Sequence, residues 1–213
     1  MAHSVASQFV DVDEFFRMEV KYPRLRWPLL IVTMAGLAFA LQTYAILLQL
    51  EDNPFDQTTI ATYIGAQFFT PFALWFVFGV ILVLTVKLLG GSIRPGGIMI
   101  ATAWGLIPTI LTGLVWTASL YVALEDAPAP TLTIAGELWY EWPDMTDWIN
   151  TAIINEPLAF GLQLLGLVFV FVGALAWVQV VRFGSNLDRT RIRVAALVPP
   201  TIYALWVLRG LFA

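Results

Sequence analysis

The sequence LLGGSIRPGG at residues 88–97 lies between two long apolar runs and decides how the chain folds. Its glycines and proline can reverse the backbone sharply, because glycine tolerates positive φ and proline fixes its own φ. Gly90 and Gly91 form the expected reversal, and Lys87 and Arg94 place positive charge on its two flanks. The stretch therefore predicts a tight turn between two antiparallel helices.

The composition indicates an integral membrane protein. Of 213 residues, 59% are hydrophobic and 12% are charged, whereas soluble domains carry roughly 25% charged residues. The net charge of −4 argues against nucleic acid as a partner, since phosphate binding requires a basic face. The chain has no cysteine, which excludes disulfides, thiol catalysis and thiolate metal sites, and His3 is its only histidine.

Five apolar runs account for most of the chain, and each is long enough to cross a bilayer. We predict an all-α polytopic membrane protein with a cytoplasmic N-terminal segment, residues 1–27, and a membrane domain, residues 28–213. The predicted spans are about 28–50, 60–89, 98–124, 157–181 and 194–212. Prolines that are expected to kink these spans are Pro71, Pro108, Pro199 and Pro200.

A short helix is expected ahead of the first span. Asp11 and Glu14 have the spacing of a capping box, and apolar residues follow at near-helical intervals. An interfacial helix would bury Phe15 and Phe16 in the headgroup layer. The equal alternative is a cytoplasmic helix that docks on the bundle and covers it.

The loop at 125–156 holds seven acidic residues and no base. Within it, apolar residues recur from Met145 to Ile153 at helical spacing, after Asp144 as an N-cap, which predicts an extracellular amphipathic helix. Glu137 and Glu141 belong to the same acidic group, but this group lacks the spacing and the glycine of a calcium loop. We therefore expect these acidic residues to form a solvated surface.

Positive charge sets the predicted orientation. Nearly all the basic residues lie before the first span or in the second-to-third and fourth-to-fifth turns, so we place the N-terminus in the cytoplasm and the C-terminus outside the cell. The residues that set this orientation are Arg24, Arg26, Lys87, Arg94, Arg182, Arg189, Arg191 and Arg193. Arg209 is the exception and is expected to snorkel outward.

Catalytic chemistry finds no support in the sequence. No ionisable residue lies deep in a span, no nucleophile is paired with a base, and residues 88–97 lack the Gly-Lys-Ser/Thr ending of a phosphate loop. We therefore expect no catalytic residue, metal site or cofactor. Gln67 and Thr70, beside Pro71, are the best candidates for a polar pocket, while amides and hydroxyls in spans generally hydrogen-bond across helices.

Small residues recur every seven positions in the fourth span, at Ala159, Gly166 and Gly173. Such a strip lets a neighbouring helix approach closely. We expect it to form one contact face with another protein, so the predicted partners are membrane lipids and other membrane proteins or a second copy of this chain.

The central turn also carries a family resemblance. Gly90 and Gly91, followed by a span with Gly105 and Pro108, look like the centre of the Yip (Ypt-interacting protein) family. Phe15-Phe16 ahead of the first span, Trp177 late in the fourth and a proline in the fifth are similar to prokaryotic members. The acidic exterior most resembles a haloarchaeal member.

The resemblance implies a five-helix fold and a non-enzymatic role as a membrane-organising scaffold or as a subunit of a larger assembly. Eukaryotic members bind prenylated Rab GTPases, but this chain lacks their long N-terminal region and Rab binding is not carried over to it. The alternative function is a transporter of small solutes or lipids, with a cavity near the proline kinks.

Overall fold

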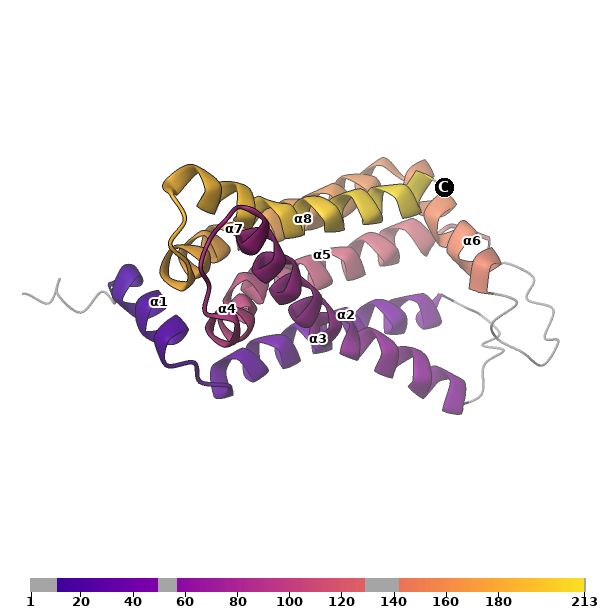
Figure 1. Ribbon diagram of the computed structural model, residues 1–213. Helices are drawn as coiled ribbons and strands as arrows, with labels where there is room; N and C mark the ends of the chain where they lie inside the picture. Colours follow the sequence, from indigo (N-terminus) through magenta and orange to yellow (C-terminus); the bar gives the residue numbers. More distant parts are fainter. Residues whose placement is uncertain (1–10, 50–56, 129–141, 213) are drawn as a thin grey trace, which may run out of the picture.

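The computed structural model describes residues 11–49, 57–128 and 142–212 (Figure 1). These residues form α-helices with one 3-10 segment, and no strand occurs among them. The elements are α1 (Val12–Lys21), α2 (Arg26–Leu48), α3 (Gln57–Leu88), α4 (Pro95–Ala101), the 3-10 helix η2 (Thr102–Leu106), α5 (Ile107–Leu124), α6 (Trp142–Asn155), α7 (Pro157–Gly184) and α8 (Arg189–Phe212).

Five helical segments within the described ranges are long and apolar enough to cross a membrane, which confirms the predicted polytopic all-α fold. They are α2, α3, α4 to α5, α7 and α8. One end of the bundle holds α1 and the turns before α4 and α8, and we call it the basic end. The opposite end holds α6 and the end of α8, and we call it the α6 end (Figure 1).

The turn at 88–97 begins with a Schellman motif that closes α3. Gly90 N–H donates to the Lys87 carbonyl at 3.0 Å, and Gly91 N–H donates to the Val86 carbonyl at 2.9 Å. Gly90 has a φ of 79°, which a residue with a side chain rarely adopts. The turn then meets the turn before α8, where Arg94 N–H donates to the Gly184 carbonyl at 3.1 Å.

The third span is divided where the sequence predicted a single kinked helix. α4 passes into η2 before α5 begins, so the change of geometry lies one turn ahead of Pro108. Proline has no N–H to donate and its ring crowds the carbonyl four residues earlier, and i to i+3 bonding in η2 avoids both problems. α3 and α8, by contrast, run as helices through Pro71 and through Pro199 and Pro200.

The core of the bundle is centred on α7, which contacts α5, η2 and α8. Trp177 is completely buried, and its indole N–H donates to the Thr102 carbonyl at 2.9 Å. The edge of the Phe78 ring meets the Trp177 indole, with ring centroids 5.2 Å apart. A single buried tryptophan thus joins η2, α3 and α7 near the basic end.

Three side chains of α5 hydrogen-bond to successive turns of α7, and we call this contact the α5–α7 seam. Thr112, Trp116 and Ser119 are its donors. Their acceptors are the carbonyls of Gly166 at 3.0 Å, Gln163 at 3.0 Å and Ala159 at 2.8 Å. Bonds of this kind need backbones that lie close together, and small residues on α7 allow that approach.

The predicted contact strip on the fourth span lies inside this seam and next to η2. Ala159 is completely buried. A Cβ at Gly166 would overlap the Trp116 indole nitrogen, and one at Gly173 would overlap the Gly105 carbonyl oxygen. The expectation that this strip meets another protein is therefore wrong, because the chain's own α5 and η2 cover it.

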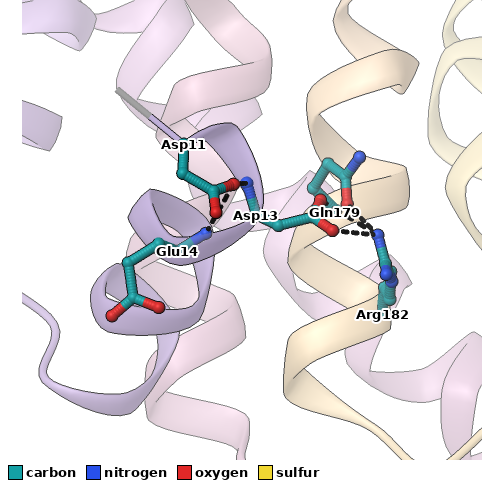
Figure 2. A network of polar contacts seen from close by, with 5 residues as sticks. All are labelled: Asp11, Asp13, Glu14, Gln179 and Arg182. Carbon is teal, nitrogen blue, oxygen red and sulfur yellow. Dashed lines mark hydrogen bonds and ion pairs between the residues drawn. The ribbon is translucent and has the colours of Figure 1, made fainter. Parts of the chain in front are cut away.

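α1 docks on the basic end, as one of the two alternatives for this segment proposed. The side chain of Asp11 caps α1 by accepting from the N–H groups of Asp13 and Glu14, at 3.0 and 3.4 Å. Asp13 then forms an ion pair with Arg182 of α7 at 2.9 Å, and Figure 2 shows Gln179 beside the same guanidinium. Among the apolar residues of α1, Phe16 and Val20 are buried in the core.

The predicted amphipathic helix near the fourth span is present as α6. It begins at Trp142, two residues before the expected cap Asp144, which therefore lies in the first turn of the helix. Met145 and Ile153 are buried, in agreement with the predicted apolar face. Most of the acidic loop before α6, including Glu137 and Glu141, lies outside the described residues.

Candidate functional site

The main candidate for a functional site is a cavity of about 530 Å³ at the α6 end of the bundle. All the spans and α6 contribute to its walls. Its lining residues are Gln42, Thr43, Ile46, Leu47, Tyr63, Gln67, Trp116, Leu120, Met145, Thr146, Ile149, Asn150, Ile153, Gln163, Trp206, Val207, Arg209, Gly210 and Leu211. Cavities of roughly 300–1,000 Å³ are typical of sites for small molecules.

Helix packing explains why a cavity forms here. Phe78 of α3 meets Tyr203 of α8 edge to face, with ring centroids 5.8 Å apart. Toward the α6 end, the first half of α3 diverges from α8 (Figure 1). Tyr63 and Gln67 line the cavity from α3, and Trp206 lines it from α8. We call this region, in which the two helices separate and both line the cavity, the α3–α8 opening.

α6 closes the end of the cavity. Its apolar face supplies Met145 and Ile153, which are both buried. The Asn150 amide donates to the carbonyl of Gly210 at 2.7 Å, which fixes α6 to the last turn of α8. The cavity is therefore covered at the α6 end, and its remaining walls are the helices that span the membrane.

The cavity contains a buried hydrogen-bond donor with no partner. Gln42 Nε2 has no solvent access and no hydrogen bond within the described parts of the chain. An unsatisfied buried amide costs roughly 1–3 kcal/mol. Thr43 and Gln163 add further polar groups to the lining, and both side chains are largely buried.

Arg209 lies at the rim of this cavity. The residue is exposed, as expected for an arginine that snorkels, but it also lines the cavity. No ion pair or hydrogen bond of its guanidinium is found among the described residues. The basic residues of the expected orientation set lie at the opposite end of the bundle, and all of their side chains are exposed. Arg209 is therefore a separate positive charge beside a partly polar cavity.

The structure separates the two residues of the predicted polar pocket. Gln67 lines the cavity, whereas the Thr70 hydroxyl donates to the Ala66 carbonyl of its own helix at 3.1 Å and is not part of the lining. None of the prolines predicted to kink the spans lines the cavity either. The cavity therefore lies nearer the α6 end than the kinks do.

Sequence reasoning assigned Gln42 and Gln163 to bonds between helices and treated Arg209 as a topological exception. The sequence did hold one signal for the cavity, namely that Gln42 and Gln163 lie at the same depth in their helices. Gln42 lies six residues before the end of α2, and Gln163 lies six residues after the start of α7. At 1.5 Å per residue, both are about 9 Å from helix ends on the same side of the bundle.

The described residues contain no group of three side chains suited to holding a metal ion. The lining residues that the structure describes offer hydrogen bonds, one positive charge and apolar contact, with no carboxylate and no histidine among them. The donors of the seam and the carboxylates of Asp11 and Asp13 are used in bonds within the chain, whereas Glu19 Oε2 of α1 is buried without a partner among the described residues.

Comparison with known proteins adds one finding. The family model described as the Yip1 domain matches residues 8–209, which is nearly the whole chain. No curated protein and no solved structure matches the chain.

Proposed function

Since the chain belongs to the Yip1 domain family, we propose that it is a non-enzymatic multi-pass membrane protein that binds an amphipathic membrane component in the cavity at the α6 end. The observation that carries this proposal is a cavity of about 530 Å³ whose lining combines the polar side chains of Gln42, Thr43 and Gln163 with apolar ones. A molecule with both a polar group and an apolar part matches these surroundings.

The wall of the cavity supports an amphipathic ligand. Trp116, Leu120 and Val207 give apolar contact area, while Gln42 and Gln163 offer hydrogen bonds. The α3–α8 opening lies between two spanning helices, so a membrane component could enter sideways from the bilayer. Burial of its apolar part against this wall would contribute about 25 cal/mol per Å².

Binding is favoured over transport by the packing of the basic end. Trp177 is completely buried there, and Leu82, Val86 and Val180 have no exposed surface either. A passage from the cavity through the bundle would have to part this core. The alternative of a small-solute or lipid transporter with a cavity near the proline kinks is therefore the weaker proposal.

A pair of glycine substitutions tests the proposed binding. Gly210 lines the cavity, Gly161 does not, and a Cβ at either position meets open space. We expect Gly210→Trp to reduce the lipid retained by the purified full chain, as measured by native mass spectrometry from mild detergent. Ile46→Trp fills the cavity from α2 and should act in the same way, whereas Gly161→Trp should retain lipid as the unmodified chain does. Equal retention by all the variants would refute binding in the cavity.

A scaffold or subunit role in a membrane assembly is the second candidate. α3 is the least buried of the five candidate spans, and its Phe69 and Phe76 are exposed. This face is available to lipid, to another membrane protein or to a second copy of the chain. Phe76→Ala should reduce the apparent size of the particle in mild detergent if α3 forms such a contact. An unchanged size would exclude this face as the contact.

The proposed orientation places the basic end in the cytoplasm and the C-terminus outside the cell, in keeping with the positive-inside rule. Because the chain has no cysteine, single cysteines introduced at Arg193 and Gly210 can report their sides to an impermeant thiol reagent. If the reagent labels only Gly210→Cys in intact cells, the result supports this orientation. If it labels only Arg193→Cys, the protein has the opposite orientation.

A salt-adapted archaeal source is a further proposal, supported by fifteen acidic residues against eleven basic ones. It predicts that unfolding in molar potassium chloride occurs at a higher temperature than in dilute buffer. A lower unfolding temperature in concentrated salt would speak against this origin.

A further inference from the structure

We infer that the molecule held in the cavity at the α6 end is a lipid with an anionic headgroup, which the Arg209 guanidinium recognises. This inference rests on the proposed binding function and names the chemical class of its ligand.

The charge on the described part of the lining is one-sided. Arg209 is the one charged side chain among the described lining residues, and no Asp or Glu stands with it there. The ion pairs within the described residues involve Arg17, Arg182 and Arg191, all at the basic end. The Arg209 guanidinium therefore has no partner among the described residues and can pair with an anion. An anion offers a guanidinium two parallel acceptors, which is the stronger type of hydrogen bond.

The buried amide makes no such selection. Gln42 Nε2 is enclosed by protein atoms and lacks an acceptor within the described parts of the chain. A phosphate oxygen is common to anionic lipids and to phosphatidylcholine, so Arg209 alone distinguishes the two headgroups. A choline group brings a second positive charge toward Arg209, whereas a glycerol headgroup leaves the phosphate charge unopposed.

Depth in the bilayer agrees with a headgroup at this place. Arg209 lies three residues before the end of α8, or about 5 Å along the helix axis, and Gln42 lies about 9 Å from the end of α2. Both lie within the outermost turns of their helices, where headgroups and the first part of the acyl chains are found. The apolar wall at Trp116 and Leu120 faces the remainder of such a chain.

The hydrogen bond between Asn150 and the Gly210 carbonyl holds the last turn of α8 beside the cavity. It uses a backbone group next to Arg209 and leaves the arginine side chain unbound. Asn150 is thus a positioning residue for the proposed headgroup site. Asn150→Leu should lower headgroup preference while leaving the positive charge in place.

The test compares two lipids that differ only in the headgroup. The full chain is reconstituted in vesicles of equimolar dioleoyl phosphatidylglycerol and dioleoyl phosphatidylcholine, extracted in mild detergent, and the retained lipids are counted by native mass spectrometry. We expect enrichment of phosphatidylglycerol, lowered about fivefold by Arg209→Gln, since one basic residue near a membrane contributes about 1 kcal/mol. Arg209→Lys should keep most of the enrichment, and Gln42→Leu should leave it unchanged, because both lipids carry the same phosphate group.

Matched controls separate the cavity from other basic sites. Arg193→Gln removes an exposed positive charge at the basic end and should leave the enrichment unchanged. In the Gly210→Trp background, Arg209→Gln should have no further effect, because the site is already filled. An equal loss in both backgrounds would place the effect outside the cavity and overturn the inference.

The remaining outcomes distinguish the two proposals. Retention of lipid without headgroup preference, unaltered by Arg209→Gln, would overturn the anionic headgroup and leave binding in the cavity intact. Full retention by Gly210→Trp and by Ile46→Trp would overturn the binding function itself. A last experiment uses inorganic phosphate in place of lipid. If phosphate alone raises the unfolding temperature and Arg209→Gln abolishes that rise, the site binds a free anion and the lipid is rejected as its source.

Discussion

The α5–α7 seam and the α3–α8 opening are two contacts between long apolar helices with opposite outcomes. In the seam, small residues bring the backbones close and three donors of α5 reach carbonyls of α7. At the opening, the bulky rings of Phe78 and Tyr203 meet, and beyond them the helices separate. Apolar composition is common to both. Side-chain volume and satisfied polar groups therefore decide whether such helices close or leave a cavity.

The largest expected effect comes from one added methyl group in the closely packed region next to the seam. Gly173→Ala should destabilise the chain by about 3 kcal/mol, since overpacking typically costs 1–3 kcal/mol and here the obstacle is a backbone oxygen that cannot rotate away. Thermal unfolding in detergent, followed by circular dichroism, measures the change. Gly161→Ala is the matched control, because its Cβ meets open space. If both variants unfold alike, close packing does not distinguish this region.

A slightly smaller loss is expected at the tryptophan between η2 and α7. Trp177→Phe removes the donor to the Thr102 carbonyl and leaves that buried acceptor without the bond, at a cost of roughly 1–3 kcal/mol. Trp206→Phe, at an exposed position, should change stability by no more than about 0.5 kcal/mol. Similar unfolding temperatures for the two variants would show that the bond at Trp177 contributes little.

At the cavity, the comparison predicts a change of opposite sign. Gln42→Leu should stabilise the lipid-free chain by about 1 kcal/mol, because it removes an unsatisfied buried donor and adds apolar contact. Gln67→Leu serves as the control, since no unsatisfied buried atom is found on Gln67 and the gain should be smaller. Unfolding of delipidated protein in detergent gives the measurement. A loss of stability in Gln42→Leu would mean that the amide is already satisfied without a ligand.

The smallest effect is expected where α1 meets α7. The Asp13–Arg182 pair is about half-exposed on both sides, so Asp13→Asn should cost only about 0.2–1 kcal/mol, and less in high salt. Hydrogen exchange of the α1 amides should quicken while the unfolding temperature of the bundle stays the same. Glu125→Gln, an exposed change at the α6 end, should leave α1 exchange unaltered. Unchanged exchange in Asp13→Asn would assign the docking of α1 to Phe16 and Val20 alone.

The spans and the central turn were accessible from the sequence because hydropathy and glycine position are local properties. The run of apolar residues fixes a helix in a bilayer, and Gly90 is the residue that adopts positive φ. The division of the third span was less accessible. A proline predicts a disturbed helix, but the choice between a kink and the 3-10 turn η2 depends on its packing against Trp177.

The functional residues were harder to predict because their role depends on which helices are neighbours. Gly166 has the same sequence signature whether it meets another helix of the chain or a partner, and only the seam identifies the former. Gln42 resembles any interhelical glutamine, and only the fold shows that its amide nitrogen is buried without an acceptor among the described residues. Arg209 was recorded as an exception to the charge rule, and its place beside the cavity required the fold.

The contact between the two basic turns also bears on how the protein is made. Spanning helices insert first and associate afterwards, and Arg94 N–H cannot reach its acceptor, the Gly184 carbonyl, until α7 has been synthesised and inserted. The Asn186 side chain likewise reaches Ser92 N–H, at 2.6 Å, only then. In a nascent chain released after α5, water would take the place of both acceptors, so the turn at 88–97 gains these two contacts only after α7 and the turn that follows it have been made.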